Sequence, residues 1–306
     1  MNRTTFVSIV LSGALLGPAT GSGQPAPGQN DIGEVSCVRG GLQRAVDHYL
    51  AAQTSGDTSG IPLAATPAYI ENMELMDIGS GLINTPLEID HHRSLLDTAT
   101  CQTFTEVIVA DEETPYVLGT RLRVNHDRIA EIEILWTTTG YWLFDADSYL
   151  AYSSAEDWGP IPAAERDSRA TLVAAANAYL DAFLEGRIDL VPWGFPCQRI
   201  EGGAYIGTGS PDDSCERGVP ANVNISNRRF VVDEVIGSVV AYCTFGIGLP
   251  GSGGSGSPDT HLFRVENGKL RYVHTLTHLL QASFGRGGGG GGGGAGGGGR
   301  GRGAQQ

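Results

Sequence analysis

Residues 263–275 read FRVENGKLRYVHT, and this stretch decides the fold. Apolar and polar side chains alternate on both sides of Asn267-Gly268, and Asn-Gly is a strong signal for a two-residue turn between antiparallel strands. Residues 122–136, LRVNHDRIAEIEILW, have the same layout around a turn at Asn125–Asp127. The chain is therefore predicted to contain one strand–turn–strand unit twice.

A helix is predicted before each of these hairpins. With an offset of 130 residues, segment 45–71 aligns without a gap on segment 175–201. The identical positions, numbered in the first copy, are Ala45, Tyr49, Leu50, Ala52, Gly56, Pro62, Ile70 and Glu71. In both copies an apolar stripe at helical spacing ends at a glycine, Gly56 or Gly186, which is typical of a helix C-terminus.

Each half thus has the order helix, loop and several antiparallel strands, which is typical of an α+β domain. We predict two such domains, at residues 35–152 and 168–281, joined by a linker rich in proline and charge. Residues 285–306 are almost pure glycine with scattered arginines, and such a chain has nothing to bury. We expect a disordered tail there rather than an RNA-binding segment.

The N-terminus has the pattern of a secretory signal. Arg3 precedes an apolar run at 6–16, and Pro18 and small residues follow it. We predict a cleavable signal at residues 1–21; the alternative is an N-terminal helix of the fold. No later stretch is long and apolar enough to span a bilayer, so we expect a protein secreted or held in the secretory-pathway lumen, without membrane insertion.

Charge and composition exclude several classes of partner. The formal net charge is −14, and an acidic surface repels nucleic acid and anionic membranes. Lys269 is the one lysine in the sequence. Schiff-base chemistry and a phosphate-loop lysine are therefore disfavoured, and we expect no cofactor.

Five cysteines are present, without a CxxC or a zinc-ligand spacing. In an oxidising compartment we predict the disulfides Cys197–Cys215, across a glycine-rich polar region, and Cys37–Cys101, within the first half. Cys243 lies in an apolar run and is predicted to be a buried free thiol. Asn224 begins the sequence Asn-Ile-Ser and is a candidate glycosylation site.

The Tyr-Leu helix and the hairpin at 263–275 resemble the NTF2-like superfamily, which includes ketosteroid-isomerase-like, SnoaL-like and scytalone-dehydratase-like proteins. The resemblance implies two tandem cone domains, each with helices packed on a curved antiparallel sheet that leaves a pocket. Sheets of this fold often pair face to face, which implies an internal pseudo-dimer or a homodimer.

The segments PCQRIEGG (196–203) and PDTHLFRVENGKLRYVHT (258–275) are similar to secreted fungal two-domain members of that superfamily. Some of their relatives resemble dimerising cyclases of maleidride pathways. This closer resemblance implies a small hydrophobic or anionic polyketide-type substrate, joined as maleic-anhydride monomers, with a histidine as base and an arginine as carboxylate clamp.

The second domain holds the main candidate residues for catalysis. If the facing sides of the last two strands coincide, His261 and His274 share one apolar wall with Tyr272. Asp259 lies just before His261 and can orient it by accepting its ring proton, and a neutral imidazole is a good general base. The catalytic candidates are thus His261, His274 and Asp259.

Tyr205, Tyr272 and Arg229 are the candidate substrate-binding residues, as donors to a developing enolate; Arg229 can also hold a carboxylate. No metal site is predicted, because His274 and His278 lie on a strand about 13 Å apart. Any of these side chains can equally be a half-buried polar residue of a sheet that its neighbours satisfy.

Two functions remain open from the sequence. One is a cofactor-free cyclase, isomerase or lyase whose second domain is the active one. The other is a secreted, non-catalytic protein that binds a small molecule or a partner. An enclosed cavity reached by His261 or His274 favours the enzyme, and a pocket filled by side chains favours the binding protein.

Overall fold

The computed structural model describes residues 34–210, 212–247 and 254–281. The predicted signal at 1–21 and the predicted tail at 285–306 lie outside the described residues. Among those described, no helix has both the length and the apolar character needed to cross a bilayer.

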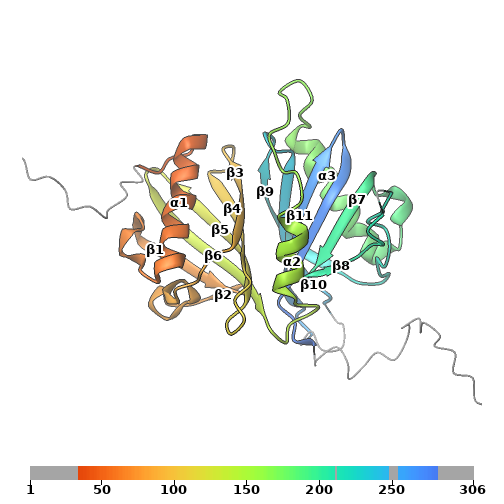
Figure 1. Ribbon diagram of the computed structural model, residues 1–306. Coiled ribbons are helices and arrows are strands. Elements are labelled where there is room, and N and C mark those ends of the chain that lie inside the picture. The colour runs from red at the N-terminus through yellow and green to blue at the C-terminus, as the bar shows by residue number, and fades with distance from the viewer. Residues whose placement is uncertain (1–33, 211, 248–253, 282–306) are drawn as a thin grey trace, which may run out of the picture. The chain divides into compact units, whose positions relative to one another are not determined.

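The first domain is a helix on a six-stranded sheet, with strand order β2-β1-β6-β5-β4-β3. Its elements are α1 (Arg39–Ser55), η1 (Thr58–Gly60), β1 (Leu63–Glu71), β2 (Glu74–Leu75), η2 (Ile78–Ser80), η3 (Leu82–Asn84), β3 (His91–Asp97), β4 (Gln102–Val109), β5 (Tyr116–Asn125) and β6 (Arg128–Thr138). The sheet is antiparallel except where β1 runs parallel to β6. Figure 1 shows α1 lying over one face of this sheet.

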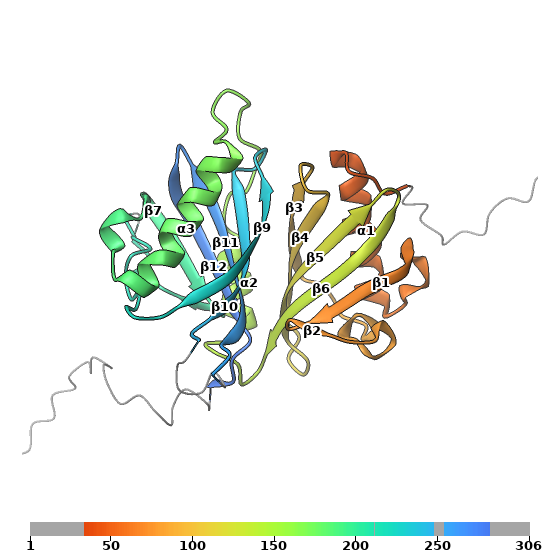
Figure 2. The same cartoon turned by 180° about the vertical axis from the view of Figure 1, so that it is seen from behind.

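The second domain repeats this arrangement, with strand order β8-β7-β12-β11-β10-β9. Its elements are α3 (Arg169–Glu185), η4 (Ile188–Leu190), β7 (Trp193–Glu201), β8 (Ala204–Tyr205), β9 (Ile225–Asp233), β10 (Ser238–Phe245), β11 (Ser257–Glu266) and β12 (Lys269–Thr277). Here β7 runs parallel to β12. The helix α2 (Ala146–Ser153) lies between the domains in sequence and contacts both β4 and β8. Figure 2 shows α3 on its own sheet.

The predicted fold class is confirmed: the chain is α+β, with two tandem domains of a helix on a curved sheet, the arrangement that the NTF2-like resemblance implies. The helices end where the sequence indicated, because Gly56 and Gly186 adopt the left-handed conformation that glycine tolerates best. All the elements of the two sheets fall within the predicted domains, whose outer limits stay predictions.

The strand register defines which residues of the two domains are equivalent. The hairpins β5–β6 and β11–β12 both contain a bulge, which lies beside the terminal pairs Asn125–Arg128 and Glu266–Lys269. Equivalent residues of these two hairpins are therefore 141 positions apart. In β3–β4 and β9–β10 the offset is 136. The helices keep the offset of 130 that the sequence shows.

Each sheet buries both of its faces. One face of each sheet packs on the helix of its own domain, α1 or α3. The opposite faces form a third apolar cluster to which both domains contribute, with Phe104 against Tyr242 and Leu95 among its members. A residue on a central strand therefore points either into the core of its own domain or into the junction between the domains. Successive residues along the strand alternate between these two directions.

Two buried carboxylates connect the domains reciprocally. Asp97 at the end of β3 binds the Arg169 guanidinium, with Nη1 at 2.8 Å from both carboxylate oxygens, and accepts the Val232 N–H at 3.0 Å. Its equivalent, Asp233 at the end of β9, binds Arg39 at 2.8 Å and accepts the Leu96 N–H at 3.0 Å. Each helix thus begins with an arginine that pairs with the other domain.

Two disulfides are present, Cys37–Cys101 and Cys197–Cys215, and these are the pairs expected from sequence position. The first ties the residues before α1 to the turn between β3 and β4. The second ties β7 to the loop that precedes β9. Disulfides of this kind fit an extracytoplasmic, oxidising compartment.

We predict that Asp97→Asn and Asp233→Asn each lower the free energy of unfolding by about 2–4 kcal/mol, because each removes the charge of a buried carboxylate that an arginine and a backbone N–H of the other domain both contact. Urea unfolding followed by circular dichroism measures the effect. Asp127→Asn, at an exposed pair with 3.8 Å between the charged atoms, is the control and should change little. Loss below about 0.5 kcal/mol in both buried variants would contradict the assignment.

Candidate active site in the second domain

A cavity of about 270 Å³ opens on the helix-facing side of the second sheet. Its lining combines apolar walls with a polar end: Trp142, Phe183, Glu201, Gly218, Pro220, Val223, Phe245, His261, Thr275 and Thr277. A pocket with mostly apolar walls and a few convergent polar groups is the usual form of a small-molecule site.

His261 and Asp259 form a hydrogen-bonded dyad at the polar end. They lie two residues apart on β11 and therefore point to the same face of the sheet. The Nδ1 atom of His261 is 2.9 Å from Oδ2 of Asp259, which is fully buried. Thr277 donates its hydroxyl to the other oxygen, Oδ1, at 2.9 Å. With the ring proton on Nδ1, Nε2 carries the lone pair that can accept a proton.

Cys243 lies behind this dyad as a buried free thiol, as the sequence indicated. Its Sγ is 3.4 Å from Oδ2 of Asp259 and 3.9 Å from Nδ1 of His261. Burial, together with the charge of Asp259, raises the pKa of this thiol well above its usual range. Cys243 is thus a hydrogen-bond donor to the carboxylate rather than a nucleophile.

The donor atoms of Cys243, Asp259 and His261 lie within 4.8 Å of one another, so these are the residues that could hold a metal ion. Ligation would displace the proton that joins His261 to Asp259 and the proton of the thiol. A metal ion held by all three residues through Nδ1 of His261 would therefore replace the hydrogen bond of the dyad. Hydrogen bonds alone already satisfy the buried carboxylate.

Arg199 and Glu201 on β7 form a second polar group that the sequence analysis did not single out. The Arg199 guanidinium is almost fully buried, and its Nε is 3.3 Å from Oε1 of Glu201. Its other nitrogens donate to the carbonyls of Cys215 at 3.0 Å and Arg217 at 2.6 Å. Glu201 could have been found from the sequence through its match to Glu71 in the repeat. A charged residue that is present in both copies of a strand indicates a specific contact in each domain.

The first domain does not repeat the dyad. The positions equivalent to Cys243, Asp259 and His261 hold Val107, Leu118 and Thr120, and those equivalent to Thr275 and Thr277 hold Ile134 and Trp136. Val107, Leu118 and Ile134 belong to the apolar core around α1. The chemistry-bearing groups are therefore concentrated in the second domain.

The predicted common wall of His261 and His274 is wrong. Arg271 is an extra residue in β12, because Val265 pairs with Leu270 whereas Arg264 pairs with Tyr272. This bulge reverses the facing of the rest of β12, and His274 lies opposite Leu262. His274 and Tyr272 therefore point into the junction between the domains, away from the cavity.

His274 is held there between two carboxylates. Its Nδ1 is 3.0 Å from Oε1 of Glu106, and its Nε2 is 2.7 Å from Oε2 of Glu156. Burial alone would lower the pKa of His274, but the charges of Glu156 and Glu106 outweigh it and raise the pKa to about 9. Burial alone would raise the pKa of Glu106, but His274 and Arg93 hold it at about 2. His274 is thus an imidazolium that joins the domains, rather than a base.

The three predicted substrate-binding residues lie outside the cavity. Arg229 faces the junction, where its two terminal nitrogens bind Glu133 at 2.7 and 2.6 Å, so its predicted role as a carboxylate clamp is not supported. Tyr272 stacks on Trp158, with 5.5 Å between ring centroids. The Tyr205 hydroxyl donates to Asp213 at 2.8 Å.

Asn224 is half-buried immediately before β9, and its carbonyl accepts the Gly246 N–H at 2.8 Å. Glycosylation at this residue stays a prediction.

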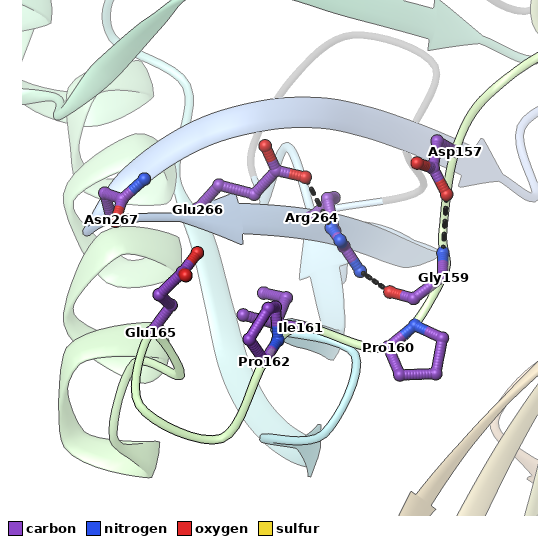
Figure 3. Close-up of a pocket in the computed structure, with 9 residues that line it drawn as sticks. All are labelled: Asp157, Gly159, Pro160, Ile161, Pro162, Glu165, Arg264, Glu266 and Asn267. Carbon is purple, nitrogen blue, oxygen red and sulfur yellow. Dashed lines mark hydrogen bonds and ion pairs between the residues drawn. The ribbon is translucent and has the colours of Figure 1, made fainter.

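A second recess lies where the linker crosses the end of β11 (Figure 3). Arg264 occupies it, with Nη1 donating to the Gly159 carbonyl and Nε donating to Glu266, each at 2.9 Å. The side chains drawn around it offer carboxylates and prolines but no histidine or cysteine. The hydrogen bond from Arg264 to Gly159 therefore attaches the linker to the second domain at this recess.

Comparison with known proteins gives a family match over part of the chain and a weak similarity to a solved structure. Residues 165–277, from the linker to the end of β12, match the model of a domain of unknown function, DUF8021. No curated protein matches the chain. A protein assigned as a SnoaL-like polyketide cyclase from Jannaschia sp. CCS1 is 14% identical, with 42% of this chain and 94% of that chain covered and a TM-score of 0.29. The fold therefore rests on the sheet topology described above.

We predict that Cys243 is the one thiol of the described residues and reacts only after unfolding. Its burial and raised pKa leave almost no accessible thiolate at pH 8. Titration with 5,5′-dithiobis(2-nitrobenzoate) should show no reaction in buffer and one thiol per chain in guanidinium chloride. Cys243→Ser should show none in either condition, whereas rapid reaction of the native wild-type protein would contradict the burial.

We predict that the protein loses stability as pH rises through about 9, because His274 then loses its proton between Glu106 and Glu156. A folded-state pKa above the ordinary value of 6.5 contributes stability that is complete below pH 6.5 and disappears above pH 9. The expected loss in free energy of unfolding is about 3 kcal/mol. Urea unfolding at pH 6.5 and pH 9.5 measures it, and His274→Gln should abolish the difference. An equal difference in the variant would assign the effect to other groups.

Proposed function

We propose that the second domain is a cofactor-independent cyclase or isomerase that moves a proton on a small, largely apolar polyketide-type substrate, within the secretory pathway. The observation that carries the proposal is the His261–Asp259 dyad at the polar end of an otherwise apolar cavity. The two disulfides support the compartment.

His261 is the proposed base. Asp259 fixes the ring proton on Nδ1, which leaves Nε2 to take a proton from a carbon next to a carbonyl. The buried carboxylate then stabilises the imidazolium that forms, and Thr277 and Cys243 keep that carboxylate in place. Proton return from Nε2 to another atom of the same intermediate completes an isomerisation.

The cavity supplies the remaining requirements. Phe183, Phe245 and Val223 displace water from the substrate, which strengthens each electrostatic interaction inside. Thr275 also lines the cavity and is the proposed hydroxyl donor to the developing enolate oxygen. The dimerising cyclisation implied by the closer resemblance stays a prediction, since neither Arg229 nor His274 reaches this cavity.

We predict that His261→Asn and Asp259→Asn each reduce proton abstraction about 10²–10⁴-fold, the usual contribution of a positioned base. Deuterium incorporation next to the carbonyl of 3-cyclohexenone in D₂O, followed by proton NMR, measures that step directly. The isomerisation of the same compound to its conjugated form gives a second readout by ultraviolet absorption.

His126→Asn is the matched control, because His126 is exposed in the hairpin turn of the first domain. It should retain full exchange. Equal exchange in the wild type and His261→Asn would overturn the mechanism. Binding without exchange would instead support a secreted, non-catalytic small-molecule-binding protein.

A further inference from the structure

We infer that the cavity selects neutral ligands over anions, and that Glu201 is the residue that determines this specificity. The inference deepens the proposed function and rests on the same cavity. It narrows the expected substrate from hydrophobic or anionic molecules to neutral ones that carry a carbonyl group.

The charges around the cavity carry the inference. Among the ten described residues that line it, Glu201 is the one carboxylate, and none is an arginine or a lysine. Asp259 adds a second negative charge directly behind His261. An entering carboxylate would therefore meet the carboxylates of Glu201 and Asp259 and no arginine or lysine on the wall, in surroundings where burial reduces screening by water. The Arg199 guanidinium, with Nε 3.3 Å from Glu201, offsets only part of that negative charge.

Arg199, which forms an ion pair with Glu201, cannot turn toward a ligand. Its Nη1 and Nη2 are hydrogen-bonded to the carbonyls of Cys215 and Arg217, at 3.0 and 2.6 Å. The disulfide between Cys197 and Cys215 fixes the segment that supplies those carbonyls. Only Nε faces Glu201, at 3.3 Å. The contact of Arg199 with Glu201 is therefore an ion pair without a hydrogen bond, and the guanidinium does not line the cavity.

The size and walls of the cavity fit the same ligand class. A volume of about 270 Å³ suits a molecule of one or two rings. The apolar walls present flat or branched side chains, from Phe183, Phe245, Trp142 and Val223. Burial of an uncharged ring against these side chains is favourable. A neutral carbonyl compound can reach the His261 end without bringing a charge.

The first domain provides a matched reference for Glu201. Glu71 occupies the equivalent position, but its carboxylate accepts hydrogen bonds from Tyr69 and from the Leu82 N–H, and the Trp136 indole donates to it at 3.2 Å. The carboxylate of Glu71 is thus hydrogen-bonded by donors of its own domain. Substitution there changes charge by the same amount without touching the second-domain cavity.

The test compares coumarin with coumarin-3-carboxylate, two molecules with the same ring system and different charge. Dissociation constants at pH 7.5 are measured by ligand-observed NMR and calorimetry on the wild-type protein. Coumarin should bind at least about tenfold more tightly than its carboxylate, as expected for a charge a few ångströms from Glu201. Glu201→Gln should reduce that ratio at least about tenfold, mainly by tighter binding of the carboxylate. Glu71→Gln should leave the ratio unchanged.

The inference fails if the carboxylate binds wild type as tightly as coumarin does, or if coumarin does not bind. It also fails if Glu201→Gln, with a native circular dichroism spectrum, leaves the ratio unchanged. Failure of the proposed function is distinguishable, because the binding ratio needs no turnover. If His261→Asn loses proton exchange but keeps the wild-type binding ratio, both the proposed function and the selectivity are supported. If the wild-type protein binds selectively but shows no exchange, the selectivity is supported and the proposed function is not.

Discussion

The arrangement of the whole chain depends on sheets that are buried on both faces. Each sheet packs on its own helix and also on the other sheet, and the reciprocal pairs of Asp97 with Arg169 and Asp233 with Arg39 fix that second contact. Buried carboxylates are tolerated only when they are paired and hydrogen-bonded. Because each pair joins the start of one helix to the end of a strand in the other domain, the two halves constrain each other.

Because the sheets are buried on both faces, the charged residues that pack against the second sheet fall into two groups: those that hold the domains together and those that reach the cavity. At the junction, His274, Glu106 and Arg229 carry charges that hold the domains together. On the opposite face of the second sheet, His261 and Asp259 reach a cavity instead. Two histidines on adjacent strands thus have unrelated roles, and the direction of the side chain decides which. In the first domain Thr120 and Leu118 occupy the dyad positions, so that domain lacks the dyad.

Much of the framework followed from local pattern. The Asn267-Gly268 turn, the helix ends at Gly56 and Gly186 and the repeat itself are short-range features, and short-range physics suffices to predict them. The Asp259–His261 contact was also predictable, because residues two apart on a regular strand share a face, and β11 pairs without a bulge there. Glu201 was visible only as a match in the repeat, and nothing local showed that it would face a cavity.

The sequence by itself determined the α+β class, the duplication, the cysteine pairs and the dyad. Tertiary structure alone decided which candidates reach the cavity. The reason is the single extra residue in β12, Arg271, which reverses side-chain facing between Leu270 and Tyr272. Alternation counted along the sequence places His274 beside His261, whereas the bulged register places it beside Leu262. A bulge depends on the partner strand and on packing across both faces, so the pattern of one strand does not contain it.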